Sequence, residues 1–116
     1  MRIVDLSTFL KLPEGTVYQK YKPQYFEDLQ VKAQSLGTND FIYADLTGNI
    51  ENDSSEDFSD KVRLMEKNPE LSLELDFDCY ARDGFFDVDQ LFAIWEKQDI
   101  EGLIDKLNHC LTEAYN

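Results

Sequence analysis

The chain has 116 residues, of which 42% are hydrophobic and 13% aromatic, which is enough for one folded domain with a core. Its 24 acidic residues exceed its 11 basic ones and give a net charge of −13. Such a charge repels nucleic acid and anionic membranes and attracts basic proteins. We therefore expect neither direct nucleic-acid binding nor a membrane partner.

The composition also favours a cytoplasmic protein. No apolar run approaches the roughly 20 residues of a membrane span, and the N-terminus lacks the basic and then apolar layout of a signal peptide. Cys79 and Cys110 are too few and too far apart for a disulfide scaffold, which fits a reducing compartment.

The first element expected is a short helix. Asp5 or Ser7 can cap it, and Leu6, Phe9 and Leu10 would share one side. Residues 12–15, Leu-Pro-Glu-Gly, end it.

Strand patterns follow the first helix. Residues 16–21 are rich in Thr, Val and Tyr, and residues 27–34 alternate apolar with polar side chains, so both segments predict strands. A turn is expected at residues 37–40. Residues 41–46 fit either a strand or a helix, and both readings stay open.

Two further helices are expected, one in the middle of the chain and one near its end. The acidic residues 51–60 predict a solvated loop that leads into a helix, with capping-box spacing from Asp53 to Glu56 and a stop at Asn68. Asp99 would cap the last helix. The buried stripe of the middle helix would be Phe58, Val62 and Met65, and that of the last helix Ile100, Leu103, Ile104, Leu107 and Leu111.

Residues 71–95 carry the strongest strand pattern. Apolar and polar residues alternate strictly from Leu71 to Cys79, and Asp83-Gly84 suits a tight hairpin turn. A hairpin about that turn would pair residues 71–79 with residues 86–95 and place Cys79 on the core face. A rival reading starts a helix at Asp87, because residues 87–90 have capping-box spacing.

The order of these elements predicts an α+β fold. We expect a single domain over residues 1–116, with a mainly antiparallel sheet of about five strands and two to three helices.

The expected hairpin gathers carboxylates on its outer face. Asp78 would lie opposite Asp89, and like charges that face each other destabilise a sheet. Either both side chains splay into water, or the pair is an acidic spot awaiting a basic partner or a cation. The residues expected to bind a partner are Glu74, Asp76, Asp78, Asp87 and Asp89. The same acids do not fit the spacing of a calcium-binding EF-hand, and we expect no metal site.

Catalytic patterns are absent from the sequence. The only histidine, His109, precedes Cys110 on the last helix, and adjacent helical residues point too far apart to form a nucleophile–base pair. There is neither a glycine-rich phosphate loop nor a Cys/His metal spacing. We expect a protein that is not an enzyme and needs no cofactor.

One resemblance adds context. Residues 12–17, Leu-Pro-Glu-Gly-Thr-Val, and residues 82–96, from Arg-Asp-Gly-Phe-Phe to Ile-Trp-Glu, resemble a group of small acidic accessory proteins of tailed bacteriophages. The resemblance implies action in the bacterial host cytoplasm, where such proteins often inhibit host factors such as restriction or CRISPR nucleases. It supplies no catalytic residues.

Three functions remain open. The leading hypothesis is a protein that binds a basic-surfaced host protein through an acidic face. In one version of this hypothesis, the acidic face mimics nucleic acid. The alternative is a small-ligand-binding or sequestering protein, with an aromatic pocket that contains Lys20, Lys32 or Arg82. The third is a regulatory or structural phage accessory protein.

Overall fold

The computed structural model describes residues 1–115, which form three helices and eight strands. The helices are α1 (Leu6–Leu10), α2 (Ser55–Lys67) and α3 (Lys97–Ala114). The strands are β1 (Arg2–Val4), β2 (Val17–Lys22), β3 (Tyr25–Leu36), β4 (Asp40–Asp45), β5 (Asn49–Ile50), β6 (Leu75–Asp76), β7 (Tyr80–Arg82) and β8 (Leu91–Ile94).

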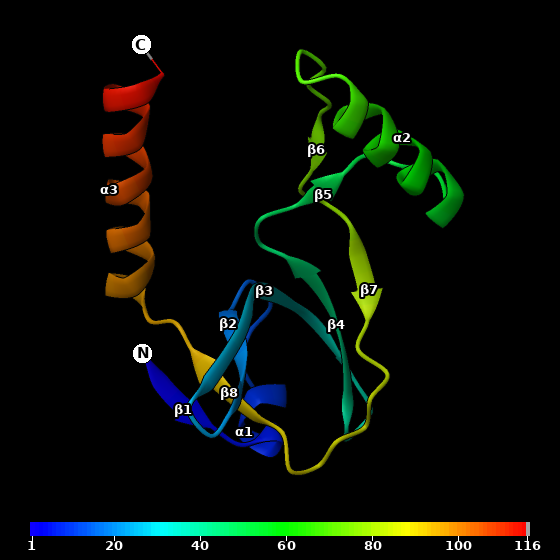
Figure 1. Ribbon diagram of the computed structural model, residues 1–116. Coiled ribbons are helices and arrows are strands. Elements are labelled where there is room, and N and C mark those ends of the chain that lie inside the picture. The colour runs from blue at the N-terminus through cyan, green and yellow to red at the C-terminus, as the bar shows by residue number, and fades with distance from the viewer. Residues whose placement is uncertain (116) are drawn as a thin grey trace.

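Six strands form one sheet in the order β1-β8-β2-β3-β4-β7, and β5 pairs separately with β6 (Figure 1). Each of these strand pairs is antiparallel. The predicted α+β fold with a mainly antiparallel sheet is thus confirmed, although the strands outnumber the five expected. The strands predicted at residues 16–21 and 27–34 are β2 and β3, and the ambiguous residues 41–46 form β4.

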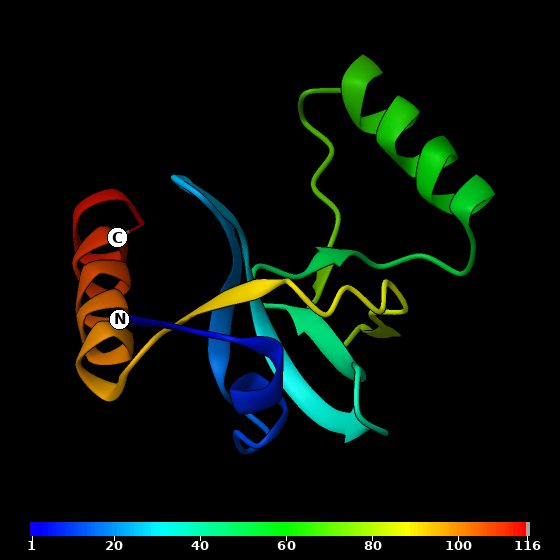
Figure 2. The same cartoon turned by 90° about the horizontal axis from the view of Figure 1, so that it is seen from below.

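α1 lies against one face of the sheet (Figure 2). The core is an aromatic cluster between the two. Phe9 of α1 is fully buried and stacks on Phe92 of β8, with 3.9 Å between the ring centroids. Tyr18 and Phe41 contact Phe9 edge-on, at 4.7 Å and 4.9 Å. Asp5 caps α1 as predicted, because its carboxylate accepts the Thr8 amide at 2.8 Å. This cap sets the short helix over the centre of the sheet.

The predicted hairpin is wrong. Of residues 71–79, only Leu75 and Asp76 are in a strand, and they pair with β5. β7 pairs with β4, while β8 lies between β1 and β2. Cys79 is exposed instead of buried. β8 is a strand, so the rival helix from Asp87 is wrong too.

Long-range partners of Asp83 and Gly84 explain this difference. The Asp83 amide donates to the Phe41 carbonyl at 3.0 Å, and the Gly84 amide donates to the Asp40 carboxylate at 2.9 Å. These bonds hold the Asp83-Gly84 segment at the start of β4. The chain therefore continues past Gly84, whose φ is +69°, instead of turning back. It then reaches β8, which lies near the opposite edge of the sheet.

The middle helix begins slightly later than predicted. Ser54 is its N-cap and accepts the Asp57 amide at 3.0 Å, so the cap lies one residue beyond Asp53. The helix ends at Asn68 as expected. Its apolar stripe is only half-buried. We call residues 49–79, which contain β5, α2 and β6, the arm.

The last helix also differs from the prediction. α3 begins at Lys97, and its N-cap is Glu96, which exchanges hydrogen bonds with Asp99 in a capping box. The amino group of Met1 pairs with Asp99 at 2.7 Å, and this contact lowers the pKa of the carboxyl group. Beyond these ties α3 stands away from the sheet, and every residue from Ile104 to Tyr115 is exposed.

The two protruding elements enlarge the molecule. The radius of gyration is 16.7 Å, whereas a globular domain of this length has about 13 Å. α3 and the arm extend in the same direction from the sheet and leave a space between them (Figure 1).

Candidate functional site

The carboxylates predicted to bind a partner fall into two groups. Glu74, Asp76 and Asp78 belong to the arm, where Glu74 and Asp78 are exposed and Asp76 is half-buried. Asp76 accepts the Asp78 amide at 2.8 Å, and the Glu74 carbonyl accepts the Glu51 amide at 3.2 Å. We call these three residues the arm acids. The pairing of β6 with β5 fixes their place.

Asp87 and Asp89 form the second group, which we call the loop acids. They lie in the connection between β7 and β8, and both are exposed. The Asp87 carboxylate accepts the Asp89 amide at 3.0 Å, and its carbonyl accepts the Gln90 amide at 3.2 Å. These bonds shape a tight bend just before β8.

The two groups do not form one cluster. β6 lies near α2, whereas the connection from β7 to β8 passes the opposite end of the sheet (Figure 1). The expected pairing of Asp78 with Asp89 is therefore wrong, because it depended on the hairpin. Within residues 1–115 no set of acidic, histidine or cysteine side chains is arranged to hold a metal ion.

A buried carboxylate anchors the start of the β7–β8 connection. The Asp40 side chain is buried and accepts bonds from the Arg82 guanidinium, the Gly84 amide at 2.9 Å and its neighbour Phe41's amide at 2.9 Å. The Arg82 hydrogen bond is the main reason that the pKa of Asp40 is lowered. This role of Asp40 was not predicted from the sequence, in which the residue belongs to the turn expected at residues 37–40.

A second ion pair fixes the same connection. The Lys20 ammonium group binds the Asp83 carboxylate and lies over the Phe85 ring, 4.6 Å from its centroid. Lys20, Phe85 and Asp87 line a depression of about 300 Å³. Because Lys20 and Arg82 are already paired with Asp83 and Asp40, neither offers an unpaired cation to an anionic ligand.

Lys32 is the third cation considered for a ligand pocket. It is only 3% exposed, and its ammonium group donates to the Ala33 carbonyl at 3.0 Å and lies 5.8 Å from the Phe9 ring centroid. Burial lowers the pKa of Lys32. Its bond to the backbone and its place beside the core ring indicate a structural residue.

Replacing Lys32 by methionine tests this interpretation through pH. A folded-state pKa below 10.5 means that the unfolded chain holds the proton more tightly, so stability rises with pH between the two pKa values. We expect Lys32→Met to change the unfolding free energy by less than about 1 kcal/mol at pH 7. Any advantage of the methionine variant should shrink as the pH rises toward 10.5.

The measurement is urea unfolding of both proteins from pH 7 to pH 10. Burial raises the pKa of Tyr18 and that of Tyr43, so the unfolded chain loses these protons more easily and both proteins become less stable at high pH. The informative quantity is therefore the difference in unfolding free energy between the two proteins. A difference that does not vary with pH would contradict a depressed pKa for Lys32.

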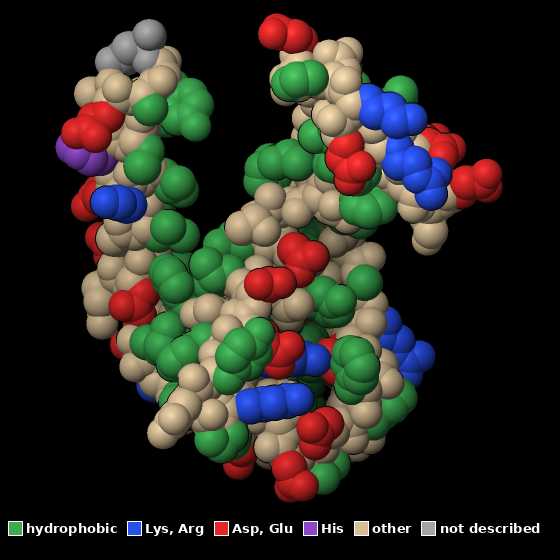
Figure 3. All heavy atoms as spheres, viewed as in Figure 1, with side chains coloured by type: hydrophobic (Ala, Val, Ile, Leu, Met, Phe, Trp, Pro, Cys, Tyr) green, Lys and Arg blue, Asp and Glu red, His purple; other side chains and the backbone are tan. Residues whose placement is uncertain are grey.

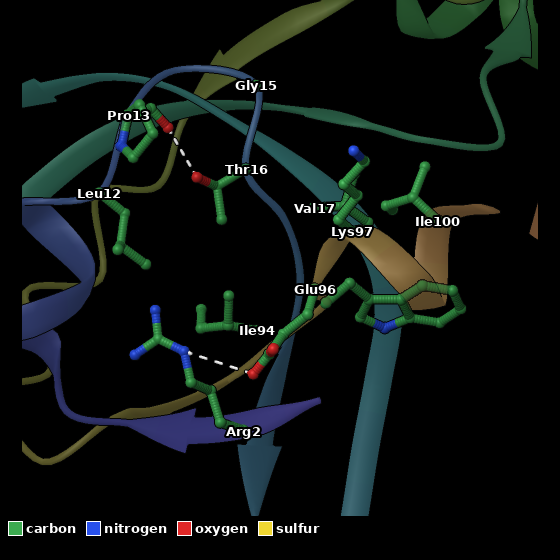
Figure 4. A pocket seen from close by; sticks show the side chains of 11 residues that line it. Arg2, Leu12, Pro13, Gly15, Thr16, Val17, Ile94, Glu96, Lys97 and Ile100 are labelled. Carbon is green, nitrogen blue, oxygen red and sulfur yellow. Dashed lines mark hydrogen bonds and ion pairs between the residues drawn. The ribbon is translucent and has the colours of Figure 1, made fainter. Parts of the chain in front are cut away.

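The base of α3 borders another depression, of about 320 Å³ (Figure 4). Arg2 extends toward Glu96 with 3.7 Å between Nε and the carboxylate, and the Thr16 hydroxyl donates to the Pro13 carbonyl at 2.7 Å. Ile94 and Ile100 supply apolar wall. Arg2 binds Glu96 and Thr16 binds Pro13, so these four polar groups do not converge on an empty point, and the contact between Arg2 and Glu96 ties the start of α3 to β1 (Figure 4).

The residues considered for catalysis stay apart. His109 pairs with Glu113 at 2.9 Å on the exposed surface of α3. Cys79 and Cys110 are both exposed free thiols on different elements. None of the three helices described in residues 1–115 is long and apolar enough to cross a membrane.

Comparison of the chain with protein-family models, curated proteins and solved structures finds no match.

Proposed function

We propose that this is a non-enzymatic binding protein that inhibits a basic-surfaced protein of a bacterial host, such as a nucleic-acid-binding defence nuclease. The resemblance to accessory proteins of tailed phages supplies the biological context, including the cytoplasm of the host cell. The observation that carries the proposal is the net charge of −13, combined with carboxylates that project from two separate parts of the surface.

The ion pairs within the protein leave these carboxylates available to bind a partner through charge. Among the ion pairs of residues 1–115, none includes an arm acid or a loop acid. A partner's lysine or arginine would gain an ion pair without first breaking one in this protein. Because complementary charges raise association rates, the acids should act mainly on the rate of complex formation.

The separation of the two groups favours an extended basic surface over a compact site. A channel that binds nucleic acid presents basic side chains along the whole path of a phosphate backbone. Arm acids and loop acids on different parts of one molecule suit contact with such a channel at more than one place. This distribution is the basis for proposing nucleic-acid mimicry.

Capture of partners from bacterial lysate, followed by mass spectrometry, identifies the target, and charge variants then test the surface. We expect Asp87→Asn with Asp89→Asn to weaken the complex, because two carboxylates that face the partner are lost. The change in Kd should shrink as salt rises from 50 to 500 mM, since salt screens exposed charges. Folding stability should stay within about 0.5 kcal/mol of the original.

A matched control removes the same charge elsewhere. Asp28→Asn with Asp105→Asn neutralises two exposed carboxylates that belong to neither group. Equal weakening by both double variants would show a net-charge effect without a defined surface. Binding that neither salt nor the variants of arm and loop acids alter would refute the proposal.

A further inference from the structure

α3 carries an apolar stripe whose outer part is exposed in the described residues 1–115. Ile104, Leu107 and Leu111 are 51%, 55% and 58% exposed. Together with Ile100 they follow one another at intervals of four, three and four residues. This alternation of fours and threes is the spacing by which one helix packs along another.

The stripe borders a hollow in the molecular surface. Apolar side chains of α3 line the edge that faces the arm (Figure 3), and β5 and β6 lie on the arm's near side (Figure 1). On β6 and just after it, Leu75 and Phe77 are 51% and 59% exposed. One chain thus supplies two apolar surfaces with an open space between them.

We propose that a second copy of this chain fills the hollow, so that the α3 helices of two copies pack antiparallel and each contacts the other's arm. The arrangement follows from the order of residues in the stripe. When two such helices run in opposite directions, Ile104 meets Leu107 of the other copy and Ile100 meets Leu111. All four residues are then paired, and the contact has the two-fold symmetry typical of homodimers.

Charge along the stripe does not oppose this arrangement. Two chains that each carry −13 repel, so carboxylates that face one another along the helices would weaken the pair. The residues that flank the stripe are Leu103 and Cys110 on one side and Glu101 and Asn108 on the other. In the antiparallel pair Glu101 lies beside Asn108 of the other copy, so no like charges meet between the two helices along the stripe.

The antiparallel direction also separates the two sheets. α3 has 18 residues and is roughly 27 Å long, so the two sheets lie at opposite ends of the helix pair. That separation exceeds the Debye length of about 8 Å at physiological salt. A parallel pair would bring the two sheets together at the same end.

The area required explains why the arm takes part. The stripe spans only about two heptads, whereas helix pairs recognised by this pattern alone run over about three or four. Stable interfaces bury about 1,200–2,000 Å² in total. Contact of each α3 with Leu75 and Phe77 of the other copy adds the area that the helix pair lacks. The inference does not depend on the proposed binding to a basic protein.

Sedimentation or light scattering over a range of protein concentrations tests the dimer. We expect a mass twice the 13.5 kDa of one chain, and Leu107→Glu should return it to one chain mass. The variant should keep its fold, because Leu107 is exposed in the single chain. Thr38→Glu adds a new charge at the exposed turn between β3 and β4, away from the hollow, and should leave the dimer intact.

Cross-linking tests the direction of the helices. In a chain whose Cys79 and Cys110 are replaced by serine, we expect an Ile104→Cys chain to form a disulfide with a mass-tagged Leu107→Cys chain. Efficient disulfides between two Ile104→Cys chains would overturn the antiparallel arrangement. A single-chain mass up to about 100 μM, or a dimer that survives Leu107→Glu, would overturn the proposal itself.

Discussion

Replacing Phe9 by alanine should cost about 3–5 kcal/mol of unfolding free energy, the cost typical of a buried phenylalanine. Phe9 is fully buried, and three other aromatic rings surround it: Phe92 at 3.9 Å, Tyr18 at 4.7 Å and Phe41 at 4.9 Å between centroids. α1 is too short to be stable in isolation, so its attachment to the sheet depends on this side chain.

Urea unfolding at one fixed protein concentration measures the effect. Phe85→Ala is the matched control, because Phe85 is 75% exposed and its ring contacts Lys20 at the surface. We expect the control to cost no more than about 1 kcal/mol. Equal losses for the two variants would contradict the assignment of the core to the cluster around Phe9.

Features set by neighbouring residues were predictable from the sequence. The cap at Asp5 and the end of α2 at Asn68 were predicted correctly, because each depends on backbone groups a few residues away. The strands β2 and β3 were also found, since a half-buried strand shows its period directly. The fold class follows from such elements in their order.

The hairpin shows where local patterns stop being sufficient. Asp83-Gly84 has the composition of a tight turn, but Asp40 and Phe41, more than forty residues earlier, bind its backbone amides. Lys20 binds the Asp83 side chain. Local sequence patterns do not show contacts between residues that are far apart in the chain. Because the predicted hairpin is wrong, the predicted proximity of Asp78 to Asp89 is wrong as well.

The last helix shows a different limit. The apolar stripe of α3 was recognised, and the pattern does indicate a face that requires cover. It does not identify what provides the cover, and the prediction that Ile104, Leu107 and Leu111 are buried was wrong. In the structure β1 and β2 occupy both edges of β8, and α1 already covers the aromatic face of the sheet. The part of the stripe from Ile104 to Leu111 is therefore exposed.

Replacing Gly48 by alanine should destabilise the arm by about 2–4 kcal/mol, since left-handed backbone strain adds to steric overlap. Gly48 has a φ of +73°, in the region that glycine adopts most easily. A Cβ atom there would lie 2.9 Å from the Asp76 carbonyl and 3.1 Å from the Phe77 ring. The carbonyl belongs to the backbone of β6, so it cannot move aside without shifting the arm acids.

The variant Gly37→Ala measures the cost of left-handed backbone strain without steric overlap of the added Cβ atom. Gly37 has a φ of +64°, but nothing lies within 4 Å of the position that its Cβ would take. It should therefore show the strain alone, at about 1–2 kcal/mol.

Hydrogen exchange at the Glu51 amide, which donates to the Glu74 carbonyl at 3.2 Å, reports on the arm directly. Gly48→Ala should accelerate exchange there and Gly37→Ala should not, because β5 and β6 depend on close approach at Gly48. Equal losses of stability and equal exchange rates in the two variants would mean that the contact between Gly48 and β6 does not hold the arm.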